Sequence, residues 1–368
     1  MKRKGSRREF LTLGALGVAG TGVFTSRSEK AQESPPPQAG GHGNNGLGTV
    51  GEVDHAANRF HPHQMLYDWD YGEISELDNG QTLRKYKFIA VDREIEIAPG
   101  IFFPAWAYGS PTSPESQRAG QLVGRVPGPT IRCVEGDRIK IEFINAGSHA
   151  HTIHFHGIHG HSMDGVPGAG DGQIAPGEST IYEFDAAPFG CHLYHCHALP
   201  LKRHIHKGLY GGFIVDPDPN KYEGEEHEIA KTRNHLYPEN KQFNDMFMIM
   251  NGFDTNFDGD NEVYAANSIA FAYMNQPIKI KGDQKQRLYL VNITEFDPIN
   301  SIHIHANFFD YYDHGTTLHP TLKTVDTIMQ CQAQRGILEF SFKDFVPVNY
   351  MFHYHQSEFA ELGWMGFF

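Results

Sequence analysis

Short segments in which apolar and polar residues alternate recur along the chain. In residues 138–144, isoleucine and phenylalanine alternate with charged residues, whereas residues 211–217 form a mostly apolar run that proline ends. Because successive side chains of a β-strand point to opposite faces, the first pattern predicts a strand with one buried face. Glycine (39) and proline (21) supply the turns between such segments. We therefore expect an all-β protein of short strands.

The predicted strands occur in two similar halves. Residues 277–283 resemble residues 129–137, and the strand expected over 286–292 resembles the strand over 138–145. A polar, charged connection separates the halves. The simplest interpretation is two copies of one β-sandwich, a first domain over residues 61–217 and a second over residues 218–368.

The N-terminus has the features of an export signal. A basic region ends in a twin arginine, Arg7-Arg8, and an apolar run of 15 residues follows over 10–24, too short for a transmembrane helix. This segment resembles the twin-arginine export signal. We expect a signal peptide over residues 1–30, a flexible linker over 31–60, a periplasmic or extracytoplasmic location, and no transmembrane span in the mature protein.

The charge of the chain limits the classes of partner. The formal net charge is −13; residues 1–30 carry seven Lys/Arg and two Asp/Glu, so residues 31–368 carry −18. An acidic body argues against nucleic acid as a partner. It favours a cationic substrate or a basic electron donor only weakly, because a solvated acidic surface would have the same charge.

Histidines occur in a pattern that indicates metal binding. The sequence His195-Cys196-His197 places a thiol between two imidazoles, and three further pairs have the form His-x-His, at 154–156, 303–305 and 353–355. On a strand, Cys196 would point to one face and its two neighbours to the other. One strand could then serve two metal sites, a copper at the sulfur and a cluster on the opposite face.

A blue copper site needs two imidazoles, one thiolate and a weak or absent axial ligand. His151, Cys196 and His204 supply the first three, and Leu209 stands at the axial position, where it cannot coordinate. His206 is the alternative to His204, which has the better spacing to Leu209. The other cysteines, Cys133, Cys191 and Cys331, are free thiols or include one disulfide.

Eight histidines then remain for a copper cluster. Reduction of dioxygen to water takes four electrons, and a mononuclear copper together with a three-copper cluster stores that number. Eight imidazoles spread over three coppers leave open positions for oxygen, unlike a closed structural site. The eight are His154, His156, His195, His197, His303, His305, His353 and His355.

With these motifs the chain resembles the two-domain, laccase-like multicopper oxidases, over about residues 65–368. The resemblance implies two cupredoxin-like Greek-key β-sandwich domains and four coppers per chain. It assigns His154 and His303 to type 2 copper, and His151, Cys196 and His204 to type 1 copper. The remaining six histidines match the type 3 pair: His156, His195, His197, His305, His353 and His355.

The second half departs from the family pattern at the positions of a type 1 site. Asn300, Tyr354, Phe359 and Trp364 stand where type 1 ligands would be. We therefore expect electrons to enter through the first half alone. The spacing from Cys196 to His204 is closer to that of copper nitrite reductases, which makes such a reductase an alternative. A non-catalytic copper-binding periplasmic protein is a further alternative.

The resemblance also implies partners and proton donors. Two-domain members form homotrimers, with each cluster between the first domain of one subunit and the second domain of the next. The partners expected are dioxygen and a small reducing substrate, phenolic or aromatic, a metal ion, or a redox protein. Asp164 and Glu358 are the candidate proton-supplying carboxylates. Residues 254–260 resemble the start of a calcium loop but lack its final glutamate, which favours a polar turn over a calcium site.

Overall fold

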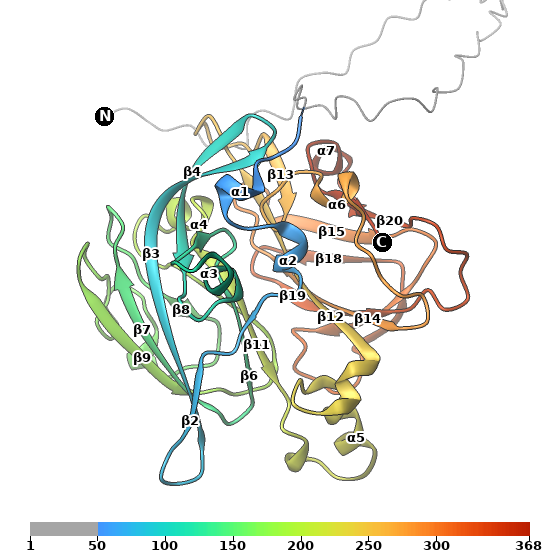
Figure 1. Cartoon of the computed structure of the whole chain (residues 1–368), viewed down its shortest axis with the longest axis horizontal. Coiled ribbons are helices and arrows are strands. Elements are labelled where there is room, and N and C mark those ends of the chain that lie inside the picture. The colour runs from blue at the N-terminus through green and yellow to red at the C-terminus, as the bar shows by residue number, and fades with distance from the viewer. Residues whose placement is uncertain (1–50) are drawn as a thin grey trace, which may run out of the picture. The chain divides into compact units, whose positions relative to one another are not determined.

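A computed structural model describes residues 51–368 (Figure 1). The signal expected over 1–30 and the linker residues 31–50 lie outside the described residues. Residues 51–60 differ from the flexible linker expected there. They include helix α1 (His55–Asn58), and the buried Asn58 amide donates to the Glu96 carbonyl at 2.8 Å while Phe60 is buried. These contacts hold the segment against strand β3.

The first half contains two sheets. The larger has the order β5-β4-β3-β7-β9, with β2 paired to β3, and the smaller has the order β1-β6-β11-β10-β8. Side chains of both sheets share one buried core, so the sheets pack face to face. The strands are β1 (Trp69–Asp70), β2 (Glu73–Glu76), β3 (Thr82–Ala98), β4 (Ile101–Gly109), β5 (Gly124–Arg125), β6 (Thr130–Val134), β7 (Arg138–Asn145), β8 (His154–Phe155), β9 (Ser179–Asp185), β10 (Gly190–His195) and β11 (Tyr210–Asp216).

The second half repeats this plan. A six-stranded sheet, β13-β12-β14-β19-β16-β17, shares a core with a four-stranded sheet, β18-β15-β20-β21. The strands are β12 (Phe243–Phe253), β13 (Val263–Ala266), β14 (Lys285–Asn292), β15 (Ile299–Ile304), β16 (Phe309–Asp313), β17 (Leu322–Val325), β18 (Thr327–Cys331), β19 (Arg335–Phe340), β20 (Met351–Tyr354) and β21 (Met365–Phe367).

The helices are short and lie in connections between strands. Besides α1 they are α2 (Pro62–Met65), α3 (Pro114–Ala119), α4 (Leu201–His206), α5 (Gly224–Arg233), α6 (Ala272–Asn275) and α7 (Ser357–Glu361), with 3₁₀ turns η1 (His161–Met163), η2 (Pro219–Lys221) and η3 (Pro238–Gln242). Between residues 51 and 368, no helix has the length and apolarity needed to cross a bilayer. The prediction of an all-β fold is confirmed.

Equivalent strands of the two halves pair in the same way. Strand β7 is parallel to β3 and antiparallel to β9, and β14 is parallel to β12 and antiparallel to β19. The expected repeat is incomplete, because residues 277–281 form no strand whereas their counterpart forms β6. Here a proline precedes a segment whose Ile278 amide bonds to the Phe367 carbonyl instead of joining a ladder.

A network of buried charges joins the two halves. Arg132 on β6 contacts Asp216 on β11 at 3.0 Å and Asp245 on β12 at 2.7 Å. Arg287 on β14 contacts the other oxygen of Asp245 at 3.2 Å and Glu339 at 2.7 Å. Each buried guanidinium thus has two carboxylate partners, which is how charges are retained inside a protein.

Candidate metal centres

Three side chains of the first half converge on one point. His204 Nδ1 lies 3.2 Å from Cys196 Sγ, His151 Nδ1 lies 3.9 Å from the same sulfur, and the two Nδ1 atoms are 3.2 Å apart. Strand β10 ends immediately before Cys196, α4 carries His204, and a bridge to Ile174 fixes His151. All three are buried. We call them the trio.

The trio has the donor set that blue copper prefers. Burial lowers the pKa of His151 to about 3 and that of His204 to about 4, so both rings are neutral ligands at pH 7. Burial raises the pKa of the Cys196 thiol, which disfavours the thiolate. A bound cation would reverse this effect by stabilising the thiolate. The Thr152 amide faces the sulfur at 3.3 Å, and Leu209 is fully buried beside the site.

His206 is placed elsewhere. Its Nε2 accepts the Asp254 amide at 3.1 Å, and its ring packs against Phe103, Phe257 and Phe296. The geometry therefore favours His204 over His206 as the partner of Cys196.

Four histidines gather on the opposite side of the Cys196 segment; we call them the first quartet. His154 on β8 stands opposite His195 on β10 across an antiparallel pair, and His156 Nε2 lies 2.9 Å from His195 Nε2. The His197 ring lies 5.2 Å from that of His154 and 5.7 Å from that of His195. The two neighbours of Cys196 thus point away from the trio, as strand alternation predicts.

Four histidines of the second half, the second quartet, have the same register. His303 on β15 stands opposite His353 on β20, and His353 Nε2 lies 3.0 Å from His305 Nε2. The His355 ring lies 5.8 Å from that of His303 and 5.5 Å from that of His353. Within residues 51–368, no compact group of metal-binding side chains combines the two quartets.

Backbone carbonyls fix the ring orientation in both quartets. His195 Nδ1 faces the Cys196 carbonyl at 2.9 Å, and His353 Nδ1 faces the Tyr354 carbonyl. A ring whose Nδ1–H donates to a carbonyl presents Nε2 as the lone-pair donor. Burial lowers the pKa of His156 to about 2 and that of His195 to about 3, which keeps both rings neutral. These quartets suit copper or another ion that accepts imidazole.

An aspartate holds one histidine of each quartet. His154 Nδ1 lies 2.8 Å from the Asp164 carbonyl and 3.0 Å from its carboxylate, which also lies 3.5 Å from His159. In the same way His303 Nδ1 lies 3.0 Å from the Asp326 carbonyl and 3.5 Å from its carboxylate. Sequence reasoning selected Asp164 and missed Asp326.

Glu358, the other expected carboxylate, lies in the exposed first turn of α7. Its proposed role as a proton donor stays a prediction.

Aromatic packing fills the position of a type 1 site in the second half. The rings of Tyr354 and Trp364 stack at 4.0 Å, and both are fully buried. Phe359 packs against Tyr354, and the buried Asn300 donates to the Asp297 carbonyl. None of these four residues offers a thiolate or an imidazole.

The cysteines and the loop after β12 answer two further questions from the sequence. All four cysteines are free, so no disulfide forms among Cys133, Cys191, Cys196 and Cys331. In the loop after β12, the Asp254 carboxylate accepts the amides of Asp258 and Gly259, as in a polar turn.

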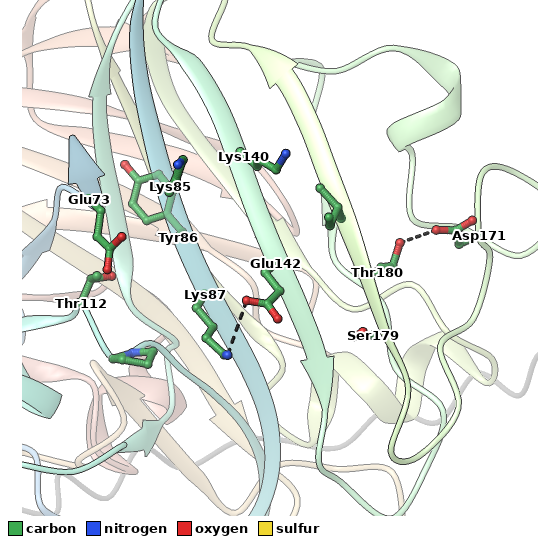
Figure 2. Close-up of a pocket in the computed structure, with 12 residues that line it drawn as sticks. Glu73, Lys85, Tyr86, Lys87, Thr112, Lys140, Glu142, Asp171, Ser179 and Thr180 are labelled. Carbon is green, nitrogen blue, oxygen red and sulfur yellow. Dashed lines mark hydrogen bonds and ion pairs between the residues drawn. The ribbon is translucent and has the colours of Figure 1, made fainter. Parts of the chain in front are cut away.

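A cavity of about 750 Å³ lies over strands β3, β7 and β9 (Figure 2). Lys87 and Glu142 pair across it at 3.4 Å, and Thr180 donates to Asp171. Its lining includes none of the trio or quartet residues. This charged, open face therefore carries none of the candidate metal chemistry.

The chain is similar to known copper proteins. The multicopper oxidase family model matches residues 106–220. A solved structure described as a multicopper oxidase is 48% identical, with a TM-score of 0.73, over 86% of this chain and 99% of that one. The copper nitrite reductase of Nitrosomonas europaea, 21% identical with a TM-score of 0.60 over 77% of this chain and 93% of that one, shares the fold.

One curated relative is a probable nitrite reductase-hydroxylamine oxidoreductase fusion protein of Kuenenia stuttgartiensis. It is 31% identical over 293 residues, which are 74% of this chain and 30% of that protein. The chain spans less than a third of the length of the curated relatives it matches. The structural neighbours confirm the expected cupredoxin-like fold. The chain belongs to the multicopper oxidase family.

Proposed function

We propose that the protein is a laccase-like oxidase, which couples one-electron oxidation of a donor to reduction of O2 to water. The observation that carries this proposal is the thiol–imidazole trio lying back to back with a histidine quartet that recurs in the second half. Copper ions, four per chain in this proposal, would supply the redox chemistry. The trio, with Leu209 as the axial non-ligand, would hold type 1 copper, His154 and His303 type 2, and the other six quartet histidines the type 3 pair.

The chain itself joins the donor site to the oxygen site. Cys196 contacts His204 through its sulfur, while His195 and His197 belong to the first quartet. An electron accepted at the trio would therefore reach the quartet through the peptide backbone of three consecutive residues. The aromatic packing of Tyr354 and Trp364 supports a single electron entry per chain.

The proposed assembly is a homotrimer in which the second quartet of one subunit completes the first quartet of the next. Exposure supports this arrangement, because His305 and His355 are exposed in the single chain. A head-to-tail interface of this kind closes as a ring. Bound copper would then stabilise the interface as well as each subunit.

The proposed location is outside the cytoplasm, after export by the twin-arginine route, since residues 1–30 resemble such a signal. The donor is then a small reducing substrate or redox partner of that compartment. Asp164 would steer protons at the oxygen site, because its carboxylate touches both His154 and His159.

A nitrite reductase-like activity is the second candidate. The name of the Kuenenia stuttgartiensis relative favours it, as does the fold shared with copper nitrite reductase. Two complete quartets favour the oxidase, since a single copper held by three histidines would leave ligands unused. A copper-storage role without catalysis predicts no oxygen consumption with any donor.

Copper counting separates these candidates. The oxidase predicts four coppers per chain, a near-UV band of the coupled pair, and O2 uptake with an electron donor. Two coppers per chain without that band would refute it.

Cys196→Ser should abolish the blue absorbance and donor oxidation while the quartet copper stays bound. Cys331→Ser, an exposed cysteine, is the matched control and should keep both signals.

A further inference from the structure

Three cations lie on or next to helix α4, which carries His204 of the trio. Lys202 and Arg203 on α4 are exposed, and the buried Lys207 follows its last residue. Within residues 51–368 their close neighbours are aromatic rings, and none is paired with a carboxylate. We call this surface the α4 patch. Its charge is opposite to the −18 carried by residues 31–368.

Each cation of the α4 patch lies over an aromatic ring. Lys202 Nζ is 4.4 Å from the ring centre of Phe296, and the Arg203 guanidinium is 5.1 Å from that of Trp106. Lys207 Nζ is 4.8 Å from the Phe257 ring. Lys207 is buried beneath the 55% exposed Phe257, whereas Lys202 is exposed and Phe296 is half-buried, so a ligand can reach the Phe296 ring and Lys202 together.

One of these rings connects the patch to the trio. Trp106 is buried, and its ring lies 4.8 Å from that of His204 and 5.1 Å from that of His151. Its other neighbour, at 4.5 Å, is the exposed His149. A donor seated on the patch is therefore separated from the trio by one ring.

Within residues 51–368 no carboxylate forms an ion pair with a cation of the patch. Asp92 acts on Lys207 through its charge without pairing with it, and its carboxylate accepts the Ser148 amide at 2.9 Å. Lys202 and Arg203 keep their charges free for a ligand. Charge complementarity therefore selects an anion, and the exposed rings select an aromatic one.

We propose that the α4 patch binds the electron donor and selects phenols that carry a carboxylate. The proposal rests on the oxidase function above. The phenol would give up one electron to the copper that the trio would hold and its proton to solvent, the carboxylate would stay unchanged on the cations, and O2 would be the final acceptor of the electrons. Local charge at the patch thus outweighs the acidic body, which alone would favour a cationic donor.

Two phenols with the same ring and opposite charge test this proposal. 4-Hydroxyphenylacetate is anionic and tyramine is cationic. The double variant Lys202→Glu with Arg203→Glu should raise KM for the anion about tenfold and lower KM for the cation, because each exposed ion pair contributes up to about 1 kcal/mol. The control, Lys231→Glu with Lys241→Glu, makes the same change in net charge around α5 and η3, away from α4 in Figure 1.

Binding without turnover gives an independent readout. Redox-inert phenylacetate is titrated into the copper-loaded protein by calorimetry, at low and high salt. Its Kd should rise about tenfold in the α4 double variant, stay unchanged in the control, and rise with salt in the wild type. An equal change in both double variants, or none in either, overturns the proposal.

The same experiment separates this site from the oxidase function. Loss of phenylacetate binding in the α4 variant, together with two coppers per wild-type chain and no near-UV band, would refute the oxidase but leave an anion site. O2 uptake with equal preference for the two phenols would refute the charge selection and leave the oxidase.

Discussion

Two aspartates in equivalent places set the orientation of one histidine in each quartet. Asp164 holds His154 through its carbonyl at 2.8 Å and its carboxylate at 3.0 Å, and Asp326 holds His303 at 3.0 and 3.5 Å. Such partners fix the tautomer and aim of a metal ligand, and removing them costs about 10- to 100-fold in metal affinity. When only the side chain is changed, the backbone carbonyl still holds the histidine. The loss of metal affinity should therefore be larger where the carboxylate lies closer to the histidine Nδ1.

We expect Asp164→Ala to weaken copper binding at its site about tenfold and Asp326→Ala to weaken it less. Competition with a copper chelator, read by the type 2 electron paramagnetic resonance signal, measures both. Asp313→Ala is the control, because Asp313 pairs with His314, which belongs to neither quartet. Equal losses in all three variants would show that the effect is one of general stability.

Residue patterns alone could identify most of the candidate ligands, but not the residues that orient the ligands or pack against them. The His-x-His spacing places both rings on one face of a strand, and a cysteine between two such histidines adds the thiolate that blue copper prefers. Trp106 and Asp326 carry no such signal, because each reaches its histidine from a strand or turn remote in sequence. Only the folded register brings them together, as it also separates His204 from His206.

Among the elements, five strands (β6, β11, β12, β14 and β19) share one buried charge network. Asp245 on β12 gives one oxygen to Arg132 on β6 and the other to Arg287 on β14. Asp245→Ala leaves each guanidinium with one carboxylate partner in a buried place. We expect it to lower the free energy of unfolding by about 3 kcal/mol, measured by urea denaturation. Glu228→Ala, which breaks an exposed pair with Lys231, should lower the free energy of unfolding far less, because solvent screens this pair.

The same network predicts how stability depends on acid. Asp216 is fully buried, which by itself raises its pKa, but Arg132 and His235 outweigh burial and lower it to about 2. A carboxylate with a lowered folded-state pKa stabilises the protein above its unfolded value, near pH 4, and this contribution disappears as the pH falls towards 2. The free energy of unfolding of the wild type minus that of Asp216→Asn should shrink by about 2 kcal/mol between pH 5 and pH 2. A difference that is constant with pH would contradict the assignment.

Strands were predicted correctly where the apolar pattern indicated a buried face, and incorrectly where strand formation depended on pairing with a neighbouring strand. The alternation over 138–144 became β7, and its counterpart became β14. Residues 277–281 have a similar apolar pattern but form no strand, and the Ile278 amide makes a single bond to the Phe367 carbonyl of β21. The local pattern of apolar residues indicates burial, whereas a strand also needs a neighbouring strand to pair with.

For the whole molecule, the two quartets differ in burial. His195 of the first quartet is 5% exposed, whereas His305 and His355 of the second are exposed. The two quartets have the same register, and the described part of one chain does not gather them into a single group. An eight-histidine cluster therefore requires a second subunit, unless each quartet works alone.

Mixed assemblies decide between these possibilities. His156→Gln breaks the first quartet and His353→Gln breaks the second, so either variant alone should have lost its cluster and its O2 uptake. When the two are co-expressed in equal amounts, a head-to-tail ring regains an intact cluster wherever an unbroken first quartet meets an unbroken second one. At each interface the first quartet is unbroken with a probability of about one half, and so is the second quartet. About a quarter of the clusters should therefore be intact, and O2 uptake should return to about a quarter of the wild-type value. Clusters confined to one chain would give no recovery, whereas independent quartets would leave partial activity in each variant before mixing.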